Sequence, residues 1–249
     1  MPLIDKMFLD ALDKLSANSA SGPDGIPSIL LKKCKYSLAD GLTTIFQRIL
    51  SSGDIPDLLK SAFVILVHKG GSRALPVKFH PVSLTSHLIK TLERIVEVSL
   101  VRYLELKMKM NPNQYGFRNQ RSCLSHLLEH YDLVLTHLEN GHNVDSIYLD
   151  FSKAFDKVDI DILCHKMKLL GICGTLAKWI HSFLTNRKQF VLVNGSISEI
   201  SWVKSGVPQG TVLGPILFLI LIYDIDKDVS SKVSLFADDT RVMGPIEAE

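Results

Sequence analysis

Apolar positions along this chain follow two spacings, and the change from one to the other divides the sequence into segments. Helical spacing marks residues 3–15 and 38–50, with the turn-rich segment Ser21–Pro27 between them. Ala62–His68 is a continuous β-rich apolar run that ends in a basic Lys-Gly-Gly loop, which predicts a buried strand. The pattern therefore predicts a helical extension over residues 1–60, followed by the first strand of a sheet.

Helical spacing returns over residues 86–109, where an apolar stripe should pack on a sheet and the charged residues are expected outside. Those charged residues are Glu93, Arg94, Glu97 and Arg102. Further helices are predicted at 123–139, 160–170 and 176–184. Strands are predicted at 144–151, 188–193 and 197–203, the last two joined as a hairpin by an Asn-Gly turn.

The end of the chain carries two strong apolar signals. Val212–Tyr223 is almost entirely apolar, but its twelve residues fall short of the ~20 that a bilayer requires, so we expect a buried core helix. Residues 233–237 and 240–243 predict two strands that turn tightly at Asp238 and Asp239. With no repeat or linker, the pattern favours one α+β unit with two lobes.

Composition and charge narrow the class of protein. A chain of 249 residues with 46% hydrophobic content can fill a sizeable core. Because the net charge is only +2, nucleic-acid binding would have to come from local patches. The four cysteines form no C-x-x-C pair, which argues against a zinc ribbon or disulfide framework and favours a reducing compartment. The amphipathic, acidic amino terminus is no secretory signal, so we expect an intracellular protein, nuclear or cytoplasmic, without a membrane partner.

The adjacent carboxylates of Asp238 and Asp239 are the most demanding feature of the sequence. Two like charges ~4 Å apart repel by about 4 kcal/mol at an effective dielectric of ~20, and a divalent metal would compensate them. The alternative is a solvated turn that suits aspartate. Asp150 ends a second apolar strand, and two such strands could clamp a pair of Mg²⁺ ions for phosphoryl transfer. Nearby carboxylates are interpreted as turn and helix-start residues: Asp156, Asp159 and Asp161.

Several strings occur in one order along nearly the whole chain: SGPDGIP, VHKGG, HPVSLTS, NQYGFR, YLDFSKAFDKVD, SGVPQGTVLGPILF and FADDT. As an ordered set they resemble the reverse transcriptases of non-LTR, LINE-like retrotransposons. The resemblance implies a right-hand polymerase with fingers and palm, in which helices back an antiparallel palm sheet. It divides the chain into an N-terminal helical extension (1–60), mainly fingers (61–143) and mainly palm (144–249), interleaved in one reverse transcriptase domain.

The resemblance implies an RNA-directed DNA polymerase that uses dNTPs to extend a DNA primer on an RNA template by two-metal nucleotidyl transfer. Asp150, Asp238 and Asp239 would be the catalytic residues and would bind two Mg²⁺ ions, with Mn²⁺ as a substitute. Phe151 would adjoin the metal site through its backbone.

The resemblance also implies nucleotide-binding residues. Lys69 would contact the triphosphate as a point charge, and Gln209 would lie over the incoming nucleotide. Phe155 is similar to a steric gate beneath the sugar, with an ordinary core phenylalanine as the alternative. His80 stands where the family has an arginine, and a mostly neutral histidine offers a weaker grip on phosphate than a guanidinium fork. Gly70 likewise replaces a second basic residue of the family.

Nucleic-acid contacts are implied in three places. Arg118 and Arg121 alternate with two aromatic residues, which suits guanidinium-phosphate and aromatic-base contacts, although a solvated loop explains them equally well. Gly210 would let the backbone approach the nucleic acid closely. Arg187 and Lys188 form a basic turn whose charge either contacts nucleic acid or only promotes solubility.

The chain stops ten residues after Asp239, which predicts a truncated domain without a thumb. Primer positioning would suffer in such a domain, and near-attack geometry normally lowers the activation barrier by several kcal/mol. The alternative function is a catalytically inactive, nucleic-acid-binding remnant of a retroelement. A generic metal-dependent phosphohydrolase would explain the aspartates but not the ordered strings.

Overall fold

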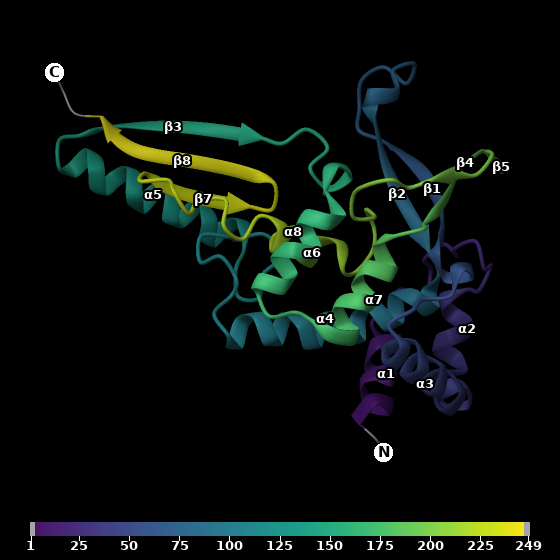
Figure 1. The fold of residues 1–249 in the computed structure, drawn as a ribbon. Coiled ribbons are helices and arrows are strands. Elements are labelled where there is room, and N and C mark those ends of the chain that lie inside the picture. The colour runs from purple at the N-terminus through teal and green to yellow at the C-terminus, as the bar shows by residue number, and fades with distance from the viewer. Residues whose placement is uncertain (1–2, 247–249) are drawn as a thin grey trace.

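A computed structural model describes residues 3–246, with side chains from residue 6 onward. Residues 1–2 of the predicted helical extension and residues 247–249 of the predicted palm segment lie outside the described residues. Two sheets stand at opposite ends of the molecule with helices between and below them (Figure 1). The helices are α1 (Leu3–Asp13), α2 (Ser28–Lys33), α3 (Lys35–Ser52), α4 (His87–Leu106), α5 (Cys123–Glu139), α6 (Ile160–Leu169), α7 (Gly174–Leu184) and α8 (Gly214–Leu221). Short 3-10 turns are η1 (Asp57–Lys60), η2 (Pro76–Lys78) and η3 (Phe155–Lys157).

The strands form two separate sheets. The first sheet has the order β2-β1-β4-β5, with β6 also paired to β4, and the aspartate sheet has the order β3-β8-β7. The strands of the first sheet are β1 (Ser61–His68), β2 (Phe79–Thr85), β4 (Lys188–Val193), β5 (Ser196–Ile197) and β6 (Ser201–Trp202). Those of the aspartate sheet are β3 (Asn143–Asp150), β7 (Lys232–Phe236) and β8 (Asp239–Ile246).

Most predicted elements are present, and the exceptions have local causes. β2 was missed because Pro81 lies inside it; β2 is an edge strand, where a missing N–H costs no ladder bond. The second strand of the predicted hairpin is split into β5 and β6. Between them the Ser198 side chain, not a backbone carbonyl, accepts a bond from Val191 N (2.9 Å).

The two lobes are interleaved along the chain. Antiparallel pairing joins β1 to β2, while β4, more than 100 residues later, lies parallel to β1 from Ser61↔Lys188 to Val64↔Val191. The helix α5 precedes both strands β7 and β8 in sequence, yet it packs against the aspartate sheet. The first sheet therefore combines strands from the predicted fingers and palm segments, whereas the strands of the aspartate sheet come almost entirely from the predicted palm segment and are packed by a helix from the fingers segment.

The hydrophobic core lies among the helices. Helix α8 buries nearly its whole length, which confirms the predicted core helix. Leu92 of α4 and Trp179 and Phe183 of α7 are fully buried in the same cluster. Among the described residues no helix is long and apolar enough to cross a membrane.

Candidate active site

Two of the three predicted carboxylates face each other at one end of the aspartate sheet. Asp150 is the last residue of β3 and pairs with Asp239, the first residue of β8. Asp238 lies in the turn before β8, and Phe236 of β7 pairs with Asp239 from the other side. Directly opposed residues of an antiparallel pair have Cβ atoms about 4.5–5.5 Å apart, so the side chains of Asp150 and Asp239 share one face. This end of β3 points toward the first sheet (Figure 1).

The charges at this end of the sheet repel one another. Burial raises the pKa of Asp239, and the negative charges of Asp238 and Asp150 raise it further. The imidazole of His126 acts in the opposite direction. The carboxylates therefore lie close enough to interact, as the hypothesis of a shared cation site requires.

A buried glutamine clamps the turn that carries the aspartates. Ala237 has a positive φ of 56°, which is strained for a residue with a Cβ atom. Its backbone N donates to Gln114 Oε1 (2.8 Å), and its carbonyl accepts from Gln114 Nε2 (3.3 Å). Gly116 N donates to the same Oε1 (2.7 Å), and a Cβ atom on Gly116 would lie only 2.4 Å from Ala237 N. Gln114 and Gly116 thus hold the strained turn from a segment 123 residues away.

Helix α5 fixes the aspartate sheet through polar and aromatic contacts. The His126 ring stacks between Tyr115 (centroids 4.9 Å apart) and Phe236 (5.8 Å). Its Nε2 lies 2.7 Å from Ser234 Oγ in β7. Burial and the positive charge of Arg241 lower the pKa of His126, which favours the neutral imidazole. This arrangement holds β7 directly before the turn with the aspartates.

The SGVPQG loop (205–210) bridges the first sheet and the turn η3 that follows β3. Gly206 adopts a φ of 90°, and a Cβ atom there would lie 2.7 Å from Asp156 O. Gln209 Nε2 donates to Asp156 Oδ1 (2.7 Å), while Gln209 O accepts from Ser83 N of β2 (2.8 Å). Gly210, with a φ of 92°, approaches Ser83 O in the same way. The glycines are therefore required by close backbone contacts, and Gln209 is already engaged by Asp156.

The segment that follows this loop is held by the buried side chain of Glu93. Glu93 was expected outside but is fully buried, and its Oε2 accepts bonds from Val212 N (2.7 Å) and Leu213 N (3.0 Å). Burial raises the pKa of Glu93 to about 6. Arg187, expected in a basic turn that either contacts nucleic acid or promotes solubility, is instead 2% exposed and donates to Phe183 O (3.0 Å). The positive charge of Arg187 and the negative charge of Glu93 each lower the free-energy cost of burying the other.

The other predicted nucleotide-binding residues lie on different elements. Phe155 is half-buried in η3 and stacks on Phe218 of α8 (4.5 Å), so it belongs partly to the core. Phe151 directly follows Asp150 and is exposed. Lys69 is exposed at the end of β1, where its N–H donates to Lys78 O, and His80 is half-buried in β2.

Both arginines of the QYGFRNQRS segment have partners within the protein. Arg118 Nη1 donates to Asn111 O (2.9 Å), and Arg121 Nη2 donates to Pro112 O (3.2 Å). The Arg121 guanidinium lies 4.4 Å from the centroid of the buried Tyr115 ring. Both side chains therefore brace this segment, and any contact with nucleic acid would use their remaining N–H groups.

The donor set at Asp150, Asp238 and Asp239 fits a hard divalent cation, since Mg²⁺ prefers carboxylate oxygens. The mutual repulsion that raises the pKa of Asp239 is what such a cation would relieve. Among the described side chains, no group of three or more His, Cys, Asp or Glu residues is gathered as a finished metal site.

A family comparison identifies the chain. Residues 67–249 match the family described as reverse transcriptase (RNA-dependent DNA polymerase), and this range contains every candidate site residue. The chain belongs to the reverse transcriptase family. The resemblance drawn from the ordered strings is thereby confirmed.

Relatives of this reverse transcriptase domain come from mobile elements. It is 31% identical to the RNA-directed DNA polymerase from mobile element jockey of Drosophila melanogaster, over 92% of this chain and 26% of the relative. The probable RNA-directed DNA polymerase from transposon X-element of the same fly is 30% identical, over 94% and 26%. A Pol polyprotein from its type-2 retrotransposable element R2DM is 27% identical, over 91% and 22%. The domain thus spans about a quarter of the length of the curated relatives it matches.

Sequence reasoning singled out the aspartates of this reverse transcriptase domain but missed the residues that hold the surrounding backbone in place. Gln114, Gly116, His126 and Glu93 all act through partners more than 100 residues away. The string NQYGFR contained a signal, because glycine is favoured where a backbone segment is approached closely, as Gly116 is by Ala237. Glu93 did carry a local signal, because it lies at helical spacing from Ile89, Val96 and Leu100 and so falls on the apolar face of α4.

Proposed function

We propose that this reverse transcriptase domain forms the fingers and palm of a right-hand RNA-directed DNA polymerase, which extends a DNA primer on an RNA template from dNTPs. The observation that carries the proposal is the register of Asp150 against Asp239, with Asp238 in the adjoining turn. A nuclear or cytoplasmic place of action belongs to the same proposal.

In this proposal Asp150, Asp238 and Asp239 hold two Mg²⁺ ions, or Mn²⁺ in their place, and the backbone of Phe151 adjoins the site. The bound ions would supply charge stabilisation to the attacking and leaving oxygens. The protein's own part is to keep opposed carboxylates together against their repulsion. Gln114 serves this end, because its bonds fix the strained Ala237 peptide and hence the direction of Asp238.

The nucleotide would be bound on the side of the SGVPQG loop. Gln209 of this loop is held by Asp156, and the half-buried Phe155 adjoins the loop because its backbone oxygen accepts from Val207 N (2.9 Å). We assign Gln209 to the incoming nucleotide, Phe155 to the sugar, and Lys69 and His80 to the phosphates. Because His80 lacks the fork of a guanidinium, we expect a weaker grip on the triphosphate than an arginine would give.

The primer and template would contact the domain through backbone and arginine groups. Gly210 brings the loop backbone close to Ser83 and leaves no room for a side chain there. Arg118 and Arg121 would contact phosphates through the N–H groups that do not brace their own segment.

The test is primer extension with the purified chain, Mg²⁺, dNTPs and a primed RNA template. We expect extension by the wild type and a loss of at least about 100-fold in Asp239→Ala, as expected when a charge-stabilising group is removed. Asp145→Ala is the matched control, because Asp145 is an exposed aspartate of the same strand β3, five residues before Asp150. A longer product of the reading frame is assayed in parallel, because the domain spans about a quarter of its relatives. Equal activity of Asp239→Ala and the wild type would refute the assignment.

A second candidate function is nucleic-acid binding without turnover. It is favoured by His80, which stands in place of an arginine of the family. It predicts steeply salt-dependent binding of a primer-template duplex without extension by either the chain or its longer product. Extension by either protein excludes it.

A further inference from the structure

Helix α5 turns its apolar side away from the protein. Five residues follow one another at intervals of four, three, four and three: Leu124, Leu128, Tyr131, Leu135 and Leu138. Their side chains are 53–66% exposed, and no residue of α5, all of which the structure describes, is buried. A surface helix ordinarily places such a stripe against the core. We call these five residues the α5 seam, and the function proposed above uses none of them.

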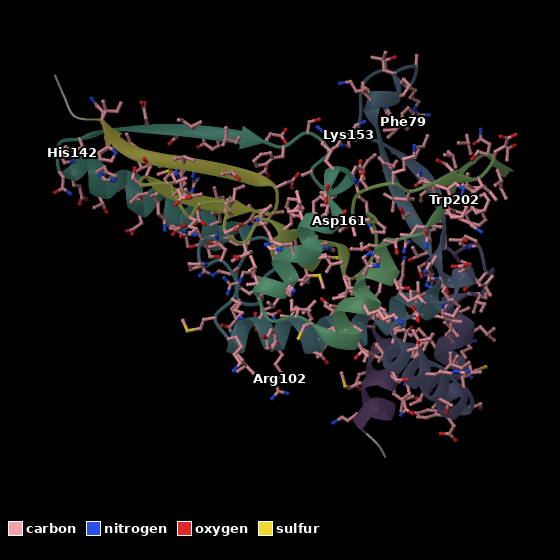
Figure 2. The ribbon with its side chains drawn as sticks, in the orientation of Figure 1. Phe79, Arg102, His142, Lys153, Asp161 and Trp202 are labelled. Atoms are coloured by element: carbon pink, nitrogen blue, oxygen red, sulfur yellow. The ribbon has the colours of Figure 1, made fainter. Side chains whose placement is uncertain are left out.

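The opposite side of α5 is polar, and this side meets the aspartate sheet. The imidazole rings of His126 and His130 contact β7 and β8, with His126 Nε2 2.7 Å from Ser234 Oγ. At 3.6 residues per turn, these histidines lie roughly half a turn away from the α5 seam. Figures 1 and 2 show the helix below the aspartate sheet, running out to His142 at the end of the molecule opposite to the first sheet. A partner docked on the α5 seam would therefore lie on the far side of α5 from the aspartates.

The spacing of the α5 seam selects a helix as its occupant. Apolar residues that alternate at three and four positions form the a and d positions along which two helices pack side by side. Leu128 and Leu135 then stand at a, and the other three residues stand at d. An extended peptide would instead require a free strand edge with pockets for alternate side chains. The α5 seam is therefore one half of a helix pair.

The charges beside the α5 seam select the kind of helix. Asp132 and Glu139 occupy the e positions and are both exposed. Residues 122–152 contain no lysine or arginine that could neutralise them. Because e and g positions form the interhelical ion pairs that set partner choice, the partner should carry lysine or arginine opposite them. An antiparallel second copy would place acid against acid, and a parallel copy would place acid against Leu127 and Val134 at the g positions.

We propose that the α5 seam binds an amphipathic helix of another protein, with apolar residues at heptad spacing and lysines or arginines along their flank. The docked helix would cover the exposed leucines of α5 and pair its cations with Asp132 and Glu139. The α5 seam and the aspartates lie on opposite sides of α5, so this interaction does not depend on polymerase activity.

Synthetic peptides test the α5 seam directly. The probe is a three-heptad peptide with leucine at a and d and lysine at e and g; one counterpart has glutamate at e and g, and the other is the lysine peptide in scrambled order. Like charges at e and g keep the two heptad peptides from pairing with themselves. Anisotropy of the labelled peptides measures their binding to the purified chain. We expect the lysine peptide to bind at least about 10-fold more tightly than either counterpart and to slow hydrogen exchange in residues 123–139.

Substitutions of the leucines test the apolar part of the interaction. Leu128→Gln and Leu135→Gln should each weaken binding of the lysine peptide about 10-fold, as expected for residues at the centre of an interface. Leu169→Gln in α6 is the matched control, because Leu169 and Leu128 are equally exposed (59%), and it should not change the affinity. Circular dichroism and the unfolding midpoint verify that each variant folds.

A reversal of charge tests the choice of partner. The double variant Asp132→Lys with Glu139→Lys should bind the glutamate peptide more tightly than the lysine peptide, because the ion pairs are then reversed. Asp40→Lys, at an exposed aspartate of α3, is the matched control and should keep the preference of the wild type. An unchanged preference in the double variant would contradict the role of these charges.

Three other outcomes would overturn the proposal. Sedimentation equilibrium should find the wild-type chain monomeric, and a dimer that Leu128→Gln abolishes would identify a second copy as the occupant. A longer product of the reading frame should bind the lysine peptide as the domain does. Failure to bind, with exchange in residues 123–139 already slow, would show that a helix of the same protein fills the α5 seam. Equal binding of the scrambled peptide would mean that only its charge is recognised.

The interaction and the polymerase function can fail separately. Asp239→Ala should bind the lysine peptide as the wild type does, while it loses primer extension. Primer extension by a wild-type chain that does not bind the lysine peptide would overturn the proposed interaction and leave the polymerase proposal intact.

Discussion

The helical core and the aspartate sheet are stabilised in different ways. Between the helices, Leu217 and Trp179 are fully buried and the packing is apolar. In the aspartate sheet, β3 is an edge strand with no buried side chain, and its Leu149 is 45% exposed. Its order comes instead from the backbone register and from polar contacts such as those of Gln114. The free energy of folding therefore resides mainly in the core, while the geometry of the site depends on a few hydrogen bonds.

A matched pair of leucine truncations tests this contrast most strongly. Leu217→Ala removes a fully buried side chain and should lower the free energy of unfolding by about 2–5 kcal/mol. Leu149→Ala, beside Asp150, should lower it by less than about 1 kcal/mol, because the Leu149 side chain is already half-exposed. Urea denaturation followed by circular dichroism measures both. Equal losses would mean that β3 is covered in solution and that the contrast is false.

The buried charge of Glu93 should weaken the core as pH rises. The pKa of Glu93 is raised to about 6 in the folded protein, from an ordinary 4.5. The protonated Glu93 therefore contributes its full stability below the pKa of the unfolded chain, and this contribution is lost as the pH rises through the pKa of the folded protein. A difference of about 1.5 units corresponds to about 2 kcal/mol. Glu93→Gln keeps an acceptor for Val212 N and Leu213 N but cannot ionise.

Urea unfolding of wild type and Glu93→Gln between about pH 4 and pH 7 isolates this effect, because other titrating groups are common to both proteins. The wild type should lose about 2 kcal/mol more than the variant over this range. Parallel stability curves would show that Arg187 fully compensates the carboxylate.

Substitutions of Gln114 test whether polar contacts stabilise the aspartate sheet. Gln114→Ala leaves the N–H groups of Ala237 and Gly116 without this acceptor and should cost about 1–2 kcal/mol, more than Leu149→Ala. Gln47→Ala, at an exposed glutamine of α3, is the matched control and should change neither the stability of the turn nor primer extension. Urea denaturation measures the free energy of unfolding. Primer extension shows whether the turn with the aspartates keeps its geometry. A Gln114→Ala protein as stable and active as wild type would contradict the clamp.

The success of the sequence analysis depended on how local each signal was. Helix α5 coincides with its prediction because its start and its Asn-Gly stop lie within the segment itself. The signal for the turn at Asp238 also lies within its own segment of the sequence. The pairing of Asp150 with Asp239 required a register between strands almost 90 residues apart, which spacing cannot supply. Glu93 was misplaced because its partners, Val212 and Leu213, meet it only after the chain folds back.

The smallest expected effect is a gain in stability when one of the aspartates is neutralised. Asp239→Asn removes one of the mutually repelling carboxylates, so without divalent cations the variant should be more stable than wild type. The gain should stay below about 1 kcal/mol, because the side chain is exposed and solvent screens the repulsion. Mg²⁺ should reverse the order, since a cation that binds only the folded wild type stabilises it by mass action. Unfolding midpoints with EDTA and with increasing Mg²⁺ measure both, and Asp145→Asn is the control that should respond to neither. A Mg²⁺ response identical in Asp239→Asn and wild type would mean that the cation binds elsewhere, and the repelling pair would then be a structural cost without a ligand to relieve it.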